Sequence, residues 1–216
     1  ERRKNLVPYT PGEQPKDKRY IKLNTNESPY PPPKSVTDSI GKAEIEDLRL
    51  YSDPECTALK AAIAEQYGVN TKNIFISNGS DEVLNFAFMA YGDKGAVFPD
   101  ITYGFYSVFA DLYGINAEVI PLKEDFTVDI NAFCGKNSLV VIANPNAPTG
   151  IALELFEIEK IVSSNPDGIV IVDEAYVDFG ADSAVSLVDK YDNLLVTQTF
   201  SKSRSMAGAR LGFGIG

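Results

Sequence analysis

A lysine among hydroxyl side chains near the end of the chain is the residue best suited to chemistry. Lys202 follows the apolar run Leu194–Val196, which predicts a buried strand, and Thr199 and Ser201 lie close to it in sequence. Further on, Arg210 offers a planar set of N–H donors that suits a phosphate. A lysine at a strand end becomes a nucleophile when its pKa is lowered, and such lysines form Schiff bases. A lysine beside a phosphate cradle suggests pyridoxal phosphate (PLP); a solvated basic loop that closes a strand is the alternative.

A second segment, Ile169–Phe179, carries an acidic pair directly after a strand-like run. Its β-branched residues predict a strand buried on both faces, and Asp173 and Glu174 follow at the carboxyl end, where open α/β sheets bind ligands. An aspartate there can keep a pyridinium nitrogen protonated, and Tyr176 could donate to the phenolic oxygen of the same ring. Glu174 could instead be a capping carboxylate. A nucleotide-dependent metal site is disfavoured because the chain has no Gly-x-x-x-x-Gly-Lys-[Ser/Thr] motif.

Two further predicted strands end in polar and turn residues. The run 138–150 contains Asn144 and Asn146, and alone it would indicate a plain proline turn. The run 73–82 places Gly79, Ser80 and Asp81 just before a helical pattern, where free backbone N–H groups and the helix dipole attract a phosphate. An ordinary N-cap by Ser80 or Asp81 is the alternative. Convergent chemistry at four strand ends is less expected by chance than at any one of them.

Taken together, these motifs show that the chain resembles the fold-type I PLP-dependent aminotransferases. Within that family, the N-terminal segments are similar to those of the enzymes that act on L-histidinol phosphate. The segments that carry the resemblance are Leu6–Glu13, Leu23–Tyr30, Tyr51–Pro54, Ser77–Glu82, Asn144–Gly150, Asp173–Tyr176 and Phe200–Lys202, together with the spacing from Lys202 to Arg210.

The resemblance implies a role for each candidate residue. Lys202 would form the Schiff base with PLP, Asp173 would pair with the pyridine nitrogen, and Tyr176 would reach the phenolic oxygen. Tyr103 would stack on the cofactor ring, and an ordinary aromatic at a helix start is the alternative for it. The cofactor phosphate would be bound by Gly79, Ser80, Thr199, Ser201 and Arg210, with Asp81 next to them.

One position departs from the family pattern. Members usually have an asparagine directly before Pro-Thr-Gly that is hydrogen-bonded to the phenolic oxygen, and this chain has Ala147 there. Either Asn144 or Asn146 substitutes for it, or Tyr176 makes this contact alone.

The resemblance also implies a reaction and an assembly. The reaction is transamination of L-histidinol phosphate with 2-oxoglutarate, which gives imidazole acetol phosphate and glutamate, with Asn26 and Tyr30 binding the substrate. Tyr51 would reach the phosphate site of the neighbouring subunit, so the enzyme would be a homodimer with shared active sites. Without the resemblance, Tyr51 would be a partly buried aromatic at a helix entrance.

Three other functions remain open at this point. An aromatic aminotransferase or a threonine-phosphate decarboxylase would share the lysine and the aspartate on the same scaffold. A nucleotide-binding module on a doubly wound sheet would have a glycine fingerprint at its first strand–helix turn, where this chain has Ser77–Ser80. A catalytically inert fragment is the third.

The net charge and the residue composition exclude several classes of partner and of catalytic site. The net charge is −10, which argues against nucleic acid or an anionic membrane as a partner, so an anionic substrate must be held by local positive groups. The chain has no histidine, which excludes histidine-based catalytic triads and histidine-ligated metals. The two cysteines, Cys56 and Cys134, have no C-x-x-C spacing and are expected to be reduced. With neither a signal peptide nor a transmembrane run in the sequence, we expect a cytoplasmic enzyme.

The order of apolar patterns predicts an α/β fold, because strands and helices alternate after residue 73. We expect a three-layer αβα domain with a mainly parallel sheet over residues 35–216, preceded by an extended N-terminal arm over residues 1–34. The sequence resembles aminotransferases up to its last residue, and we expect their small C-terminal domain to be absent from it. The predicted strands lie near 74–77, 96–98, 118–120, 139–143, 169–172, 194–198 and 211–215, and the helices near 56–67, 82–91, 103–113, 152–164 and 183–190.

Overall fold

The computed structural model describes residue 13 and residues 21–39 and 46–216. Most of the predicted arm, including the motif Leu6–Glu13 apart from Glu13, therefore lies outside the described residues. Helix α1 (Lys34–Ser39) begins where the arm was expected to end. Among the described residues, no helix is both long and apolar enough to cross a membrane.

The described part of the chain contains one sheet of seven strands in the order β1-β7-β6-β5-β4-β2-β3. Strand β7 pairs antiparallel with β1 and β6, and the other neighbours are parallel. All seven strands lie within one residue of their predicted bounds, and the prediction of a mainly parallel sheet is confirmed. The strands are β1 (Ile74–Ser77), β2 (Ala96–Pro99), β3 (Ala117–Ile120), β4 (Leu139–Ala143), β5 (Val170–Asp173), β6 (Leu194–Thr199) and β7 (Gly212–Ile215).

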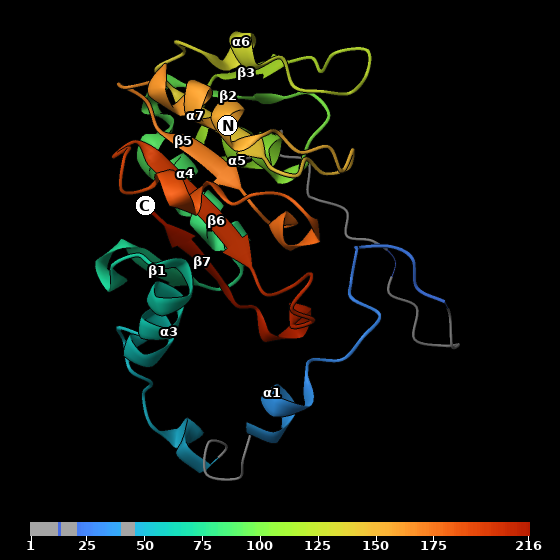
Figure 1. Cartoon of the computed structure of the whole chain (residues 1–216), viewed down its shortest axis with the longest axis vertical. Coiled ribbons are helices and arrows are strands. Elements are labelled where there is room, and N and C mark those ends of the chain that lie inside the picture. Colours follow the sequence, from blue (N-terminus) through green and yellow to red (C-terminus); the bar gives the residue numbers. More distant parts are fainter. Residues whose placement is uncertain (1–12, 14–20, 40–45) are drawn as a thin grey trace.

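Helices cover both faces of the sheet, as Figure 1 shows. Strand β4 is buried on both sides: Val140 and Ile142 pack with one group of helices, while Leu139 and Val141 pack with the other. This is why β4 and β5 are continuous apolar runs and do not alternate with polar residues. The predicted three-layer αβα arrangement is confirmed. The first face carries α3 (Thr57–Tyr67), α6 (Ile130–Phe133) and α7 (Leu155–Ser163), and the second carries α4 (Ser80–Tyr91) and α5 (Phe105–Tyr113).

One predicted helix is wrong. Residues 183–190 contain only a short 3-10 turn, Ala184–Leu187, before the chain enters β6. The Ser183 hydroxyl accepts from the Val185 N–H, and the Glu174 side chain accepts from the Ala184 N–H. These bonds satisfy the first backbone donors of the turn, and the short connection to Leu194 leaves little room for a longer helix.

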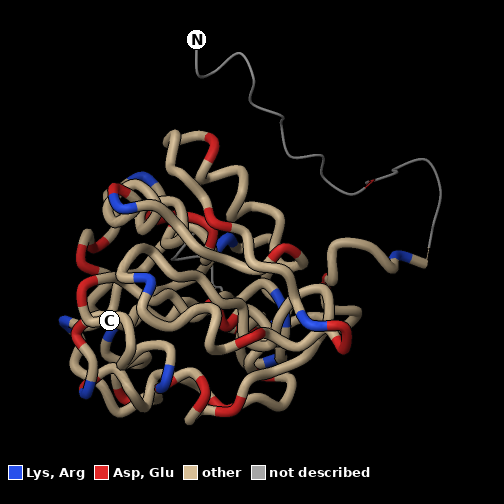
Figure 2. Tube along the Cα trace, turned by 90° about the horizontal axis from the view of Figure 1, so that it is seen from above, with Lys and Arg blue, Asp and Glu red and all other residues tan. Residues whose placement is uncertain are grey.

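The parallel pairing decides where the polar strand ends lie. Strands β1, β2, β4, β5 and β6 point the same way, so their carboxyl ends meet at one edge of the sheet. Strand β7 runs the other way and enters the sheet from this edge at Gly212. The turns after β1, β5 and β6, and the segment before β7, are thereby brought together. Figure 2 shows that acidic and basic residues are interspersed over the folded part of the chain.

Candidate active site

A cavity of about 480 Å³ lies at the carboxyl edge of the sheet. A larger hollow, about 660 Å³, lies at the opposite edge, and none of the predicted site residues lines it. The chemistry predicted from the sequence therefore belongs to the smaller cavity. The predicted site residues that line it are Ser80, Asp81, Tyr103, Asp173, Tyr176, Thr199, Ser201, Lys202 and Arg210.

The carboxylate at the floor of the cavity is that of Asp173, the last residue of β5. It is 4% exposed, and it accepts hydrogen bonds from the Tyr106 hydroxyl at 2.7 Å and the Thr197 hydroxyl at 3.1 Å. Burial raises the pKa of Asp173, and these two hydrogen bonds oppose the rise by favouring the charged form. Burial also raises the pKa of Tyr106 well above its usual value, so this hydroxyl keeps its proton and acts as a donor. The two donors fix the orientation of the carboxylate.

Glu174, the second member of the acidic pair, turns away from the cavity. It is 1% exposed, and its two carboxylate oxygens accept from the Ala184 N–H, the Ser183 hydroxyl and the Gln198 amide. Burial raises the pKa of Glu174 to about 7. Glu174 is not the N-cap residue of the turn that follows it, and its carboxylate instead accepts from the first N–H of the turn Ala184–Leu187, whose N-cap is Ser183.

The amine of Lys202 lies at the mouth of the cavity, in the loop that follows β6. Its Nζ donates to the Thr25 carbonyl at 3.0 Å and lies 5.5 Å from the centre of the Tyr176 ring. Asn26 donates from Nδ2 to the Tyr176 hydroxyl at 2.9 Å. Thr25 and Asn26 belong to the N-terminal segment, which Figure 1 shows running past this edge of the sheet. This segment therefore closes one side of the cavity.

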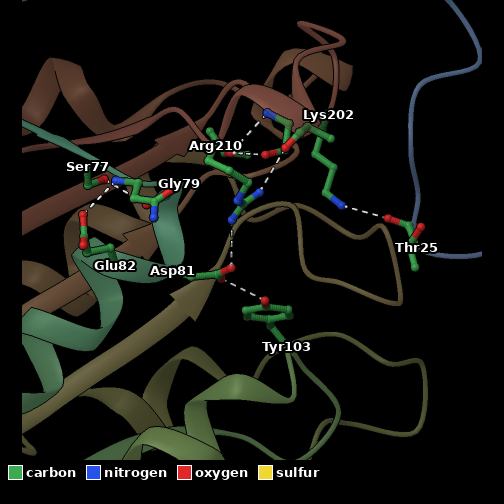
Figure 3. A network of polar contacts seen from close by, with 12 residues as sticks. Thr25, Ser77, Gly79, Asp81, Glu82, Tyr103, Lys202 and Arg210 are labelled. Atoms are coloured by element: carbon green, nitrogen blue, oxygen red, sulfur yellow. Dashed lines mark hydrogen bonds and ion pairs between the residues drawn. The ribbon is translucent and has the colours of Figure 1, made fainter. Parts of the chain in front are cut away.

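The other end of the cavity is suited to an anion. Helix α4 begins at Ser80, and its N-cap is Gly79, whose backbone has φ +77° and no side-chain cap hydrogen bond. The N-cap alternative for Ser80 and Asp81 is therefore wrong, and backbone N–H groups at this terminus face the cavity region without a capping side chain. Arg210 reaches across from the segment before β7, and Figure 3 shows its guanidinium beside Gly79 and above Asp81.

Asp81 links the anion-binding end to the predicted stacking residue. Its carboxylate accepts from the Tyr103 hydroxyl at 2.8 Å and lies 3.8 Å from Arg210 Nη2 (Figure 3). On the neighbouring loop, the Thr199 hydroxyl donates to Ser201 Oγ at 2.9 Å. The residues expected at the phosphate therefore come from the start of α4 and from the end of β6 with its connection to β7, two segments that are far apart in the sequence.

Four predicted site residues are not brought to the cavity. Asn144 binds both backbone groups of Leu153 through its side chain, and Asn146 bonds to the Ile101 carbonyl and to Thr102. The Asn144 amide holds the turn 144–153 together, and the Asn146 amide binds this turn to residues 101 and 102. Neither asparagine lines the cavity, so Tyr176 remains the candidate for the contact that Ala147 cannot make. Tyr30 is 76% exposed, and its backbone N–H and carbonyl bond to the Ser28 hydroxyl. Tyr51 is fully exposed on this chain and also lies outside the lining.

The sequence analysis missed three residues that shape the site. Tyr106 lies in the first turn of α5, three positions after Tyr103, which precedes the helix, and the two rings pack edge to face with 5.7 Å between their centroids. Thr197 lies directly opposite Asp173 in the β5–β6 register, two residues before Thr199 on the same face. Thr25 contributes a backbone carbonyl, which no residue type encodes.

Comparisons with known proteins identify the family of the chain. Residues 18–216 match the model of the family described as aminotransferase class I and II. The chain is 59% identical to the histidinol-phosphate aminotransferase of Brachyspira hyodysenteriae, over 99% of this chain and 61% of that protein. It is 55% identical to the histidinol-phosphate aminotransferase of Clostridium acetobutylicum, over 100% of this chain and 62% of that protein.

A solved structure shows the same fold. The histidinol-phosphate aminotransferase from Sinorhizobium meliloti, in complex with pyridoxal-5'-phosphate, superposes with a TM-score of 0.75 at 27% identity, over 88% of this chain and 55% of that one. The chain spans about three fifths of the length of the curated relatives it matches. Because the family model covers all but the first 17 residues, the chain belongs to the aminotransferase class I and II family.

Proposed function

We propose that this chain is the cofactor-binding part of a PLP-dependent aminotransferase, with residues 1–34 as an arm and residues 35–216 as part of its large domain. The observation that carries the proposal is that Lys202 and the buried Asp173 line one cavity whose far end is formed by Arg210 and the start of α4. A cavity of about 480 Å³ lies within the range that small-molecule and cofactor sites occupy. Lys202, Asp173 and the end of the cavity at Arg210 match the aldehyde, the ring nitrogen and the phosphate of PLP, respectively.

The phosphate end has the close approaches that such a ligand requires. A Cβ on Gly79 would lie 2.7 Å from Arg210 Nη2, and a Cβ on Gly212 would lie 2.3 Å from the Ser80 backbone nitrogen. Gly212 is therefore restricted to glycine by backbone packing, and Gly79 is restricted by its φ of +77°, which favours glycine. Their bare backbone lets the arginine fork and the helix N-terminus come together, which supports binding of a phosphate monoester.

When bound, PLP supplies a carbonyl that condenses with amines and a ring that withdraws electrons. Asp173 supports this chemistry, because a buried carboxylate is stabilised by an adjacent positive charge and so favours a protonated ring nitrogen. The hydrogen bonds from Tyr106 and Thr197 fix the orientation of that carboxylate. Lys202 carries the primary amine among the described lining residues, so it is the group that can take a proton from the amino-bearing carbon of the substrate and return it elsewhere.

The proposed donor is L-histidinol phosphate and the proposed acceptor is 2-oxoglutarate, with imidazole acetol phosphate and glutamate as products. The named relatives at 59% and 55% identity support this choice over an aromatic aminotransferase or a threonine-phosphate decarboxylase. Asn26, held on Tyr176, lies where a substrate would enter, and Tyr30 would have to turn inward to join it. We place the enzyme in the cytoplasm.

We further propose that the working unit is a homodimer. Tyr51 is fully exposed on this chain. The alternative role, a partly buried aromatic at a helix entrance, would require it to pack against its own chain. Leu48 and Leu50 beside it are exposed as well, at 80% and 54%. An apolar exposed segment next to a tyrosine with no local role supports a contact with the phosphate site of a second subunit.

The test is to trap the cofactor on the protein. The chain, within the complete protein, is incubated with PLP, reduced with borohydride and mapped by mass spectrometry. We expect the pyridoxyl group on Lys202, and Lys202→Arg should abolish it while the control Lys190→Arg leaves it in place. A label on Lys190 or Lys160, or no label in the PLP-saturated protein, contradicts the proposal.

The substrate is tested separately, with PLP-loaded enzyme that has not been reduced with borohydride. Glutamate formation from 2-oxoglutarate should be fastest with L-histidinol phosphate as donor. Faster turnover of an aromatic amino acid, or CO₂ release from threonine phosphate, would assign the enzyme to the corresponding alternative.

A further inference from the structure

The loop that carries Lys202 is held from outside the cavity. Arg204 Nε lies 3.3 Å from Asp178 Oδ2, and the Ser203 hydroxyl donates to the same carboxylate oxygen. One carboxylate thus binds both residues that directly follow Lys202. Neither Asp178 nor Arg204 lines the cavity.

Arg204 is itself fixed by three other elements. Its Nη2 donates to the Tyr67 hydroxyl of α3 and to Gln198 Oε1 of β6, both at 2.9 Å. Its guanidinium carbon lies 4.8 Å from the centre of the Phe200 ring and 5.6 Å from that of Phe213. A planar guanidinium fits this place because it can stack on rings while its fork of donors serves several acceptors at once. An ammonium could satisfy only part of this arrangement.

Asp178 connects this anchor to the other side of the cavity. It lies in the 3-10 turn Val177–Phe179, directly after Tyr176. Backbone hydrogen bonds close the opposite loop, from the Ser205 N–H to the Lys202 carbonyl at 3.0 Å and from the Met206 N–H to the Phe200 carbonyl at 2.9 Å. The contact between Asp178 and Arg204 therefore joins two loops, one bearing Tyr176 and the other bearing Lys202.

We propose that Asp178 and Arg204 are a positioning pair that fixes the Lys202 loop against the Tyr176 turn and so sets where the lysine amine lies. The anchoring follows from the contacts above, and its catalytic consequence rests on the proposed function. Because a displacement of about 1 Å in a reacting group can lower a rate about 100-fold, loosening this loop should act on the chemical step. Neither residue touches the cofactor site, so the pair acts through Lys202.

The first arm of the test measures the loop without cofactor. Backbone hydrogen exchange is followed for residues 200–206 in the cofactor-free protein, comparing Asp178→Ala, Arg204→Lys and the milder Asp178→Asn. We expect exchange in this loop to be at least about tenfold faster in the first two variants, because each loses an anchor. The matched control Glu118→Ala breaks an exposed pair with Lys136 at 2.5 Å on β3 and should leave the loop unchanged.

The second arm measures Lys202 itself. The rate of covalent PLP capture at Lys202, read by borohydride trapping, should fall at least about tenfold in Asp178→Ala and Arg204→Lys, and the double variant should lose little more than either single one. The rate of capture in Asp178→Asn, which retains an acceptor for Ser203, should lie between that of the unsubstituted protein and that of Asp178→Ala. If Asp178→Ala does not fold, Asp178→Asn and Arg204→Lys carry both arms.

If hydrogen exchange in residues 200–206 is unchanged in the Asp178 and Arg204 variants, the proposal is overturned. It is also overturned if exchange becomes faster while the rate of PLP capture is unchanged, because the pair would then have a structural role only. Failure of the unsubstituted protein to capture PLP on Lys202 would instead refute the proposed function. The exchange arm would still decide whether the pair holds the loop.

Discussion

The buried carboxyl of Glu174 makes the stability of this protein depend on pH in a way that can be measured. Burial raises its pKa from the ordinary value of 4.5 to about 7. The folded state therefore binds a proton that the unfolded chain releases between these two pH values. The contribution of Glu174 to stability is greatest below pH 4.5 and is lost as the pH rises through about 7.

The size of the effect follows from the pKa difference. At about 1.4 kcal/mol for each pH unit, moving the pKa from 4.5 to about 7 changes the free energy of unfolding by about 3 kcal/mol in the limit. Between pH 5 and pH 8, where the protein can be compared conveniently, about 2.5 kcal/mol of this change is expected. The side chain is only 1% exposed, so solvent screening reduces the figure little.

The assay is urea unfolding of the cofactor-free protein at pH 5 and pH 8, at constant ionic strength, with and without Glu174→Gln. The glutamine does not titrate, so the stability difference between the two proteins should change by about 2.5 kcal/mol over this range, in the direction that penalises the glutamate at high pH. The control Glu65→Gln removes an exposed carboxylate of α3. A difference that stays constant within about 0.5 kcal/mol would refute the reasoning, because Glu174 would then titrate alike in both states.

Three further results are expected. Asp173→Asn should retain PLP but lower kcat by about 10- to 100-fold or more, the equivalent of one charge-assisted hydrogen bond; near-normal turnover would leave Asp173 with a structural role. Arg210→Ala should weaken PLP binding by about 10- to 100-fold in a fluorescence titration and leave the affinity for pyridoxal, which has no phosphate, unchanged; equal losses for both ligands would contradict a phosphate contact. Mixing inactive Tyr51→Phe and Lys202→Ala chains should restore activity if sites are shared between subunits, and no recovery on mixing would place Tyr51 within its own subunit.

The secondary structure and layering could be predicted almost completely from the sequence. The apolar runs of β4 and β5 have a length and composition that only a strand covered on both faces satisfies, and the strand–helix alternation then selects a parallel sheet. The failure at residues 183–190 has a tertiary cause. The donors of that segment are taken by Ser183 and by Glu174, which comes from a different loop, and local propensity carries no trace of that contact.

The position of some candidate site residues could also be predicted from the sequence, and that of others could not. Asp173 and Lys202 were predictable because they lie at or just after the carboxyl ends of β5 and β6, and parallel strands bring these ends to one edge. Arg210 reaches the same edge because it precedes β7, which runs the other way. Asn144 and Asn146 carry the same kind of local signal, yet the Asn144 amide holds a turn and the Asn146 amide binds that turn to the loop at Ile101.

Residue type and spacing thus determined which groups this chain offers for chemistry and at which edge of the sheet they lie. Only the tertiary structure decided which of them face the cavity, because that depends on partners distant in the sequence: the Tyr106 hydroxyl on Asp173, the Thr25 carbonyl at Lys202 and the Asp178 carboxylate on Arg204. Those contacts form only when the packed layers bring loops together, since hydrogen-bond geometry is satisfied over a few tenths of an ångström and sequence spacing does not set positions so closely.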